Sequence, residues 1–143
     1  MPDAPEPLLL ERRVETGDDA YVDRITADGK LWTWSTVEAR YEDGTWSFGA
    51  REPAWELAGT LGAADLDALR EAIAASGFFG TDAEYRPDVA VIHGSNEVWT
   101  AERDGRRHTS TVHARGTTHV PELSALDAAL RAAQAAARGE PRE

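Results

Sequence analysis

The dipeptide Asp104-Gly105 lies between two stretches, 96–103 and 106–113, in which apolar and polar residues alternate. Asp-Gly in such a setting is the strongest local signal for a β-hairpin, because a type I′ turn needs positive φ at both central residues. A two-residue turn places Arg103 opposite Arg106 and fixes the register of both strands. We therefore expect a central ribbon on which the rest of the chain packs.

The register divides this ribbon into two faces. The face that we expect to join the core carries Glu97, Trp99, Ala101, His108, Ser110 and Val112. The other face is rich in threonine, as is typical of a half-exposed sheet, and carries Val98, Thr100, Thr109 and Thr111. Glu102 lies opposite Arg107, which predicts a cross-strand ion pair.

Three more turns predict further hairpins. They are formed by Thr16, Gly17, Asp18 and Asp19, by Asp28-Gly29, and by Asp43-Gly44. We expect strands at 8–15, 21–25, 31–42 and 46–50, a fifth strand or an extended segment at 55–61, a loop at 81–88 and a short strand at 89–93.

The predicted strand 31–42 changes parity along its length. Its tryptophans, Trp32 and Trp34, occupy even positions, whereas its later apolar residues, Val37, Ala39 and Tyr41, occupy odd ones. A bulge or bend near 35–36 would bring both sets inward. The sequence therefore predicts one long, distorted strand.

Four of the five tryptophans fall in the first half of the chain: Trp32, Trp34, Trp46 and Trp55. The turn at 43–44 places Trp46 opposite Tyr41, and we interpret Trp46 and Trp55 as core residues. For Trp32 and Trp34 two interpretations stay open. They either fill the core or form an aromatic binding face.

Two helices are predicted by apolar residues on one stripe. The first, 63–76, carries Leu66, Leu69 and Ile73, and the second, 121–137, carries Leu123, Leu126 and Leu130. Gly77 suits the end of the first helix and Pro121 the first turn of the second. We expect an α+β fold, an antiparallel sheet of hairpins with both helices packed on one face. The domain spans 8–138, between a disordered lead-in (1–7) and a disordered tail (139–143).

Composition narrows the function classes. The 143 residues carry a formal net charge of −11, which disfavours binding to nucleic acid. Cysteine is absent, so metal sites with thiolate ligands and thiolate nucleophiles are both excluded. No apolar run reaches the length of a membrane span, and we expect a cytoplasmic protein.

Basic residues and histidines gather near the central ribbon. Arg103, Arg106, Arg107 and Arg115 form a strip that either grips a carboxylate or an acidic partner, or keeps an edge ribbon soluble. The histidines are His93, His108, His113 and His119. His108 and His113 lie on opposite faces of one strand, so they cannot share a metal ion, while a pair of His113 with His93 or His119 stays open. We expect no metal site.

Motifs for catalysis and for cofactors are missing. The sequence has no GxSxG, no GxGxxG after a strand, no P-loop and no HExxH. The acidic residues form no pair in an apolar setting that would separate their pKa values. We therefore expect neither catalysis nor a bound cofactor.

The order of elements and turns resembles the emfourin-type domains, small bacterial α+β proteins. The residues that carry the resemblance are Thr16-Gly17, Asp28-Gly29, Leu66, Leu69, Ile73, Gly77-Phe78-Phe79, Asp104-Gly105, Pro121, Leu123, Leu126 and Leu130. Some members of that family inhibit thermolysin-like metalloproteases. The resemblance implies an α+β fold and a protein partner, with a metalloprotease as the specific expectation.

Our hypothesis from the sequence is thus a non-catalytic protein-binding domain. Its candidate contact residues are Thr16, Gly17, Asp18, Asp19, Trp32, Trp34, Arg103, Arg106 and Arg107. If the activity is inhibition, we expect the contact at 16–19, 43–44 or 94–96, because function concentrates on loops held by a rigid sheet. The alternative is a small-molecule-binding or enzymatic domain that uses the tryptophan-rich face and the His/Arg strip.

Overall fold

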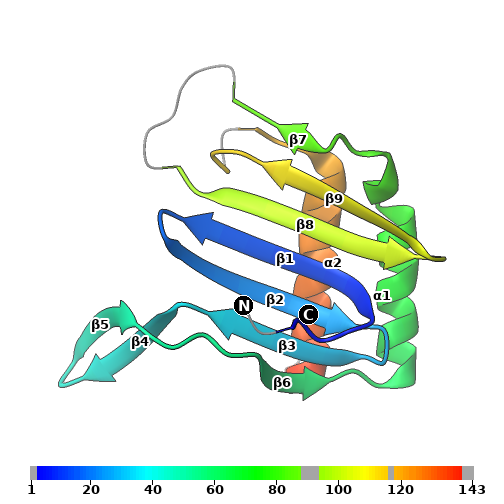
Figure 1. Cartoon of the computed structure of the whole chain (residues 1–143). Helices are drawn as coiled ribbons and strands as arrows, with labels where there is room; N and C mark the ends of the chain where they lie inside the picture. The colour runs from blue at the N-terminus through cyan, green and yellow to red at the C-terminus, as the bar shows by residue number, and fades with distance from the viewer. Residues whose placement is uncertain (1–2, 88–93, 116–117, 140–143) are drawn as a thin grey trace.

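The computed structural model describes residues 3–87, 94–115 and 118–139 (Figure 1). Its strands are β1 (Leu8–Thr16), β2 (Asp19–Thr26), β3 (Lys30–Ser35), β4 (Val37–Glu42), β5 (Thr45–Ala50), β6 (Glu56–Thr60), β7 (Glu84–Tyr85), β8 (Asn96–Arg103) and β9 (Arg106–Val112). Its helices are α1 (Ala63–Ala75), a short 3-10 helix (Phe78–Gly80) and α2 (Pro121–Arg138). A seven-stranded sheet has the order β6-β3-β2-β1-β8-β9-β7, and β4 pairs with β5 in a separate sheet.

The central ribbon confirms the predicted register. Arg103 pairs with Arg106, and the turn residues Asp104 and Gly105 have φ of 52° and 77°. Trp99, Ala101 and Ser110 are fully buried on the predicted core face, with Val112 buried beside them. The predicted ion pair is present, with Arg107 Nη2 2.8 Å from a Glu102 carboxylate oxygen.

The other predicted turns are present, with one correction. Thr16 pairs with Asp19 across a two-residue turn, and Gly44 has a φ of 78° in another. Gly29 also has positive φ, but its loop contains three residues, because Ile25 pairs with Leu31. A left-handed residue at the end of a three-residue loop is the usual geometry for that length.

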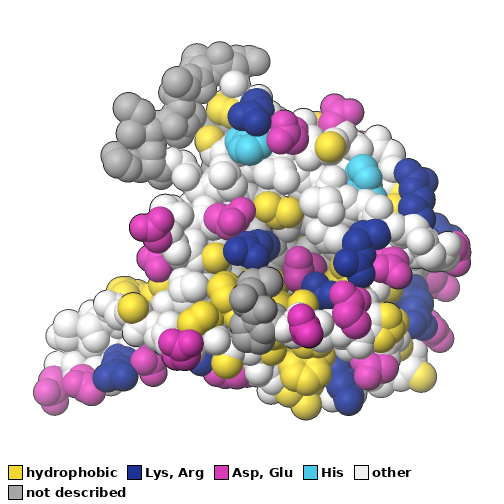
Figure 2. Space-filling model, in the orientation of Figure 1, with side chains coloured by type: hydrophobic (Ala, Val, Ile, Leu, Met, Phe, Trp, Pro, Cys, Tyr) yellow, Lys and Arg dark blue, Asp and Glu magenta, His cyan; other side chains and the backbone are white. Residues whose placement is uncertain are grey.

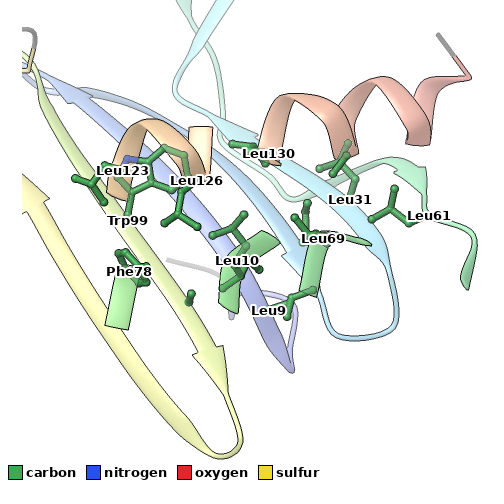
Figure 3. Close-up of a cluster of buried hydrophobic side chains, with 14 of the residues drawn as sticks. Leu9, Leu10, Leu31, Leu61, Leu69, Phe78, Trp99, Leu123, Leu126 and Leu130 are labelled. Atoms are coloured by element: carbon green, nitrogen blue, oxygen red, sulfur yellow. The ribbon is translucent and has the colours of Figure 1, made fainter. Parts of the chain in front are cut away.

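Both helices cover the same face of the large sheet, as the sequence predicts (Figure 1). The core lies between helices and sheet, where Leu69 from α1, Leu126 and Leu130 from α2, and Leu10 and Leu31 from the strands pack together (Figure 3). Gly77 ends α1 with a φ of 80°, and Phe78 after it is fully buried. No helix in the described part of the chain is long and apolar enough to span a membrane.

The predicted strand 31–42 is where the expectation is wrong. Instead of bending inward, the chain leaves the large sheet at Thr36 and continues as β4 in the hairpin with β5. The parity change therefore marks a change of sheet. Trp46, interpreted above as a core residue, is 62% exposed.

Two further differences concern short elements. Within the predicted loop 81–88, β7 pairs in parallel with β9. Two residues that pair across so long a separation leave no periodic signal in the sequence. The strand expected at 89–93 lies outside the described residues.

Candidate functional site

The hairpin of β4 and β5, hereafter the arm (37–50), projects from one end of the large sheet (Figure 1). Its pairing gives it two chemically distinct faces. The apolar face carries Val37, Ala39, Tyr41, Trp46, Phe48 and Ala50, and the polar face carries Glu38, Arg40, Glu42, Thr45, Ser47 and Gly49. Such a strict division is typical of a hairpin that has one face against an apolar surface.

No such surface covers the apolar face among the described residues. Tyr41 is 61% exposed, Trp46 62% and Phe48 73%. Tyr41 and Trp46 contact each other, with ring centroids 5.1 Å apart and planes tilted by 54°. Large contiguous apolar patches are rare on monomeric proteins and mark interaction sites.

Thr36 holds the arm to the large sheet. Its N–H donates to the Ala20 carbonyl at 3.0 Å, and its carbonyl accepts from the Arg51 N–H at 3.0 Å. Its hydroxyl accepts from the Ala20 N–H at 3.0 Å and lies 3.2 Å from a carboxylate oxygen of Asp19. The root of the arm is therefore bound to the residues that follow the β1–β2 turn.

A cavity of about 260 Å³ lies at the root of the arm. It is lined by Val14, Thr16, Asp19, Ala20, Tyr21, Ser35 and Val37. Val37 belongs both to this cavity and to the apolar face of the arm, so the two are continuous. An apolar side chain of a partner that lies along the arm could enter this cavity.

Two of the segments expected to make contacts, 16–19 and 94–96, meet at this end of the sheet, whereas the third, 43–44, lies at the tip of the arm. The β1–β2 turn and residues 94–96 are adjacent, since the Thr16 and Ser95 hydroxyls are 2.7 Å apart. The arm begins next to the same turn, through the contact of Thr36 with Asp19. The β1–β2 turn thus lies next to both residues 94–96 and the root of the arm.

Charge around this surface is mainly acidic. Asp18 and Asp19 lie at the root of the arm, and Glu42 and Asp43 lie at its tip. Figure 2 shows acidic side chains along the projecting arm. Arg40 is paired with Glu38 at 3.1 Å, so the cation on the arm is locally compensated.

Trp32 and Trp34 lie on the sheet face away from the helices. Trp34 is 7% exposed in a small cluster with Ala20 and Val22, and Trp55 packs against it. The Arg13 guanidinium lies 5.8 Å from the Trp34 ring centroid. Trp34 therefore fills space, and the half-buried Trp55 supports it, as the core interpretation of Trp55 requires.

A segment before β1 lies on the same face. Arg24, 4% exposed, donates to the Pro5 carbonyl and pairs with Glu6 at 2.9 Å and with Glu11 at 2.7 Å. Glu6 also pairs with Arg107 at 3.2 Å. Residues 5 and 6, expected in a disordered lead-in, thus contact two strands of the sheet.

The arginines of the central ribbon lie at the end of the sheet opposite the arm (Figure 1). Arg106 donates to the Phe79 carbonyl and lies over the Phe79 ring, while Arg103 is 3.7 Å from Asp104. The hydrogen bond from Arg107 to Glu102 raises the pKa of Arg107 above its ordinary value. Each of these three side chains has a partner within the protein. Because they lie at the opposite end of the sheet, they are not part of the surface around the arm.

The described histidines do not converge. His108 lies 3.0 Å from the Thr81 hydroxyl and packs against Phe78, whereas His113 lies 3.7 Å from Glu84 on the other face. His93 lies outside the described residues. Among those described, no three His, Asp or Glu side chains are grouped so that they could hold a metal ion.

A polar cavity of about 400 Å³ lies between the sheet and the start of α2, and Arg12, Glu97 and His119 line it. Arg12 pairs with Glu97 at 3.0 Å and lies over the Tyr21 and Trp99 rings. The charge of Arg12 is therefore compensated by Glu97. For this reason the cavity offers a ligand fewer unpaired charges than its size suggests.

The sequence did not predict the exposure of Tyr41, Trp46 and Phe48. The 43–44 turn predicts the pairing of Trp46 with Tyr41 correctly, but the interpretation of Trp46 as a core residue is wrong. The sequence does contain a signal of this exposure. The predicted strand 21–25 can pair only with the first residues of 31–42, which leaves 45–50 as the partner of 37–42. Comparison with protein-family models and with curated proteins gives no match for this chain.

Proposed function

We propose that this chain is a non-catalytic protein-binding domain that contacts its partner through the apolar face of the arm. The observation that carries this proposal is the exposure of Tyr41, Trp46 and Phe48 on one face of a hairpin. Exposing them to water is unfavourable, and a partner that covers them would recover that free energy.

The residue types favour recognition of a protein. Tyr and Trp are enriched at the centres of protein interfaces, where they supply a large contact area with few rotatable bonds. The neighbouring cavity at the root of the arm adds a place for one apolar side chain. A rigid sheet supports both, which limits the conformational entropy lost on binding.

The charge of the chain favours a basic partner. With a net charge of −11 and acidic residues at both ends of the arm, electrostatic attraction would speed association with a positive surface. We expect the association rate to fall as salt is added, because exposed charges are screened.

Inhibition of a thermolysin-like metalloprotease is the more specific form of the proposal. It rests on the family resemblance and on the meeting of 16–19, the arm and 94–96 at one end of the sheet. The alternative, a ligand-binding or enzymatic domain, has less support, because Trp34 is buried and Arg107 is paired within the protein.

A site-specific crosslinking experiment tests the proposal. A photo-crosslinking amino acid replaces Phe48 in the full chain, expressed in its source cells, and the control carries it in place of the exposed Arg131 of α2. We expect a discrete protein adduct at position 48 that is missing at position 131. Lack of any adduct at 48, or the same adducts at both positions, would refute binding through the arm.

A second experiment tests inhibition alone. The activity of thermolysin is measured across a concentration series of the purified chain. Inhibition that the double variant Trp46→Ser/Phe48→Ser removes, and that Thr45→Ala/Ser47→Ala on the polar face retains, would support the inhibitor form. Undiminished protease activity at micromolar protein would reject that form without rejecting another partner.

A further inference from the structure

The arm has two open backbone edges. In the described part of the chain β4 and β5 form a two-stranded sheet of their own. The two-residue turn makes Glu42 and Thr45 a hydrogen-bonded pair, and such pairs alternate along an antiparallel ladder. Val37, Ala39 and Tyr41 therefore direct their N–H and C=O groups away from β5. Those of Val37 are bonded to the Ser35 hydroxyl, at 3.1 Å and 2.9 Å, so the open part of the edge is formed by Ala39 and Tyr41. This edge can pair with another strand.

The open edge of β4 begins beside the large sheet. At Thr36 the N–H is bonded to Ala20 after the β1–β2 turn, and the carbonyl is bonded to Arg51 after β5. The large sheet and β5 thus lie on opposite sides of the chain at this point. A strand added to β4 would have its end near Asp18 and Asp19.

Charge distinguishes the two edges. On the polar face β4 carries Glu38, Arg40 and Glu42, with Arg40 paired to Glu38 at 3.1 Å, whereas β5 carries only uncharged residues there. Side chains directly opposite each other on neighbouring strands interact, and opposite charges are favourable. A strand with basic residues opposite Glu38 and Glu42 would therefore gain more electrostatic free energy beside β4 than beside β5.

We propose that β4 accepts an extended segment of the partner as a third strand of the arm, and that this segment alternates apolar with polar residues and carries two basic residues four positions apart. The proposal rests on the proposed function and specifies how the arm binds. Apolar residues of the segment would extend the face formed by Ala39 and Tyr41. Its two basic residues would lie opposite Glu38 and Glu42, and the polar residue between them, opposite Arg40, would be uncharged. Main-chain hydrogen bonds would supply affinity, and the alternating side chains would supply specificity.

A second copy of the chain is a poorer occupant. Antiparallel addition of its β4 would bring Glu42 and Asp43 of one copy toward Asp18 and Asp19 of the other, and the contact would occur twice. It would also join two chains that each carry a charge of −11. Like charges facing each other across strands are destabilising.

Two synthetic peptides test the proposal directly. One is the nine-residue peptide Val-Lys-Val-Thr-Val-Lys-Val-Thr-Val, whose lysines are four positions apart, and the other has glutamate in place of both lysines. We expect the lysine peptide to slow hydrogen exchange at the amides of Ala39 and Tyr41 by about tenfold or more, and to affect Arg40 less because its amide already bonds to β5. The glutamate peptide should have no effect. Equal protection by both peptides, or protection of β5 amides alone, would overturn the proposal.

A matched pair of proline variants identifies the edge. Ala39→Pro removes an outward N–H from β4, and Ala50→Pro removes one from β5, while neither breaks a hydrogen bond within the arm. We expect Ala39→Pro to weaken binding of the lysine peptide by about tenfold, and Ala50→Pro to leave it unchanged. The reverse order, or no effect of either, would contradict addition to β4.

The same variants separate this proposal from the proposed function. If the adduct at position 48 forms as strongly in Ala39→Pro as in the natural chain, the arm binds a partner without strand addition, and only this inference fails. If no adduct forms at position 48, the proposed function itself fails. A dimer seen by sedimentation that Ala39→Pro removes would identify a second copy as the occupant and overturn the basic partner.

Discussion

Tyr41 and Trp46 face each other across the arm with ring centroids 5.1 Å apart, yet each is more than half exposed. An isolated two-stranded hairpin is marginally stable in water, and a cross-strand aromatic pair stabilises it by about 0.5–1.5 kcal/mol. The pair therefore has two roles that are compatible. It stabilises the free arm and presents the surface that we propose for recognition.

Gly105 tests the geometry of the central ribbon. Its φ is 77°, and a Cβ there would meet nothing within 4 Å, so the cost of Gly105→Ala comes from the backbone alone. We expect the free energy of unfolding to fall by about 1–2 kcal/mol in urea denaturation. Gly80→Ala is the control, since Gly80 also has open space but no positive φ. Equal effects at the two positions would contradict the turn.

Gly59 tests the contact between β6 and the end of α2. A Cβ at this position would lie 2.9 Å from the carbonyl oxygen of Ala137. Gly59→Ala should lower the free energy of unfolding by about 1–3 kcal/mol, because α2 would have to move away from the sheet. Gly49→Ala in β5, where nothing lies within 4 Å, should have little effect. If both variants unfold at the same urea concentration, α2 does not end against β6.

Leu126 tests the docking of α2. It is fully buried in the core, so Leu126→Ala should lower the free energy of unfolding by about 2–5 kcal/mol. Leu57→Ala removes the same atoms from an exposed position on β6 and should cost much less. A neutral Leu126→Ala in chemical denaturation would show that the helix does not pack as described.

Asp23 predicts a pH dependence of stability. Burial raises the pKa of its carboxyl above the ordinary value, although the charges of Arg12 and Arg138 act in the opposite direction. Because the pKa of Asp23 is higher in the folded state, stability falls as the pH rises from the ordinary pKa of 3.8 through the folded-state pKa. Below pH 3.8 the carboxyl is neutral in both states, and no stability is lost. Asp23→Asn stays neutral, so its stability relative to the natural chain should rise from acidic to neutral pH.

Asp28→Asn is the matched control with the opposite sign. A hydrogen bond from Thr26 lowers the pKa of the Asp28 carboxyl, so the natural chain gains stability above the ordinary pKa and loses it on acidification. The free energy of unfolding, measured in urea at neutral and acidic pH, should therefore change in opposite directions for the two variants relative to the natural chain. The same trend in both would contradict the assignment for Asp23.

The sequence predicted what local patterns determine. The 104–105 turn placed Trp99 opposite Ser110, and the stripe of Leu123, Leu126 and Leu130 placed one face of α2 in the core; the structure confirms both. Alternation states which side chains share a face of a strand, but it does not state what covers that face. For that reason Trp46 was assigned to the core, although its pairing with Tyr41 was correct.

Contacts between distant segments were beyond local patterns. The ion pairs of Glu6 with Arg24 and Arg107 depend on the path of the chain before β1, which no periodicity specifies. The parallel pairing of β7 with β9 has the same origin. Arg12, on the helix-facing side of β1, also breaks the rule that such positions are apolar, because Glu97 and two aromatic rings accommodate its charge.

The attachment of the arm at Thr36 has an evolutionary consequence. The side chains that form the core belong to the large sheet and the helices, whereas the exposed aromatic side chains belong to the arm. A substitution at Tyr41, Trp46 or Phe48 would therefore change the surface that we propose for recognition without removing an atom from the core. Because the core and the proposed recognition surface are formed by separate residues, we expect the arm to diverge faster between related proteins than the large sheet and its helices.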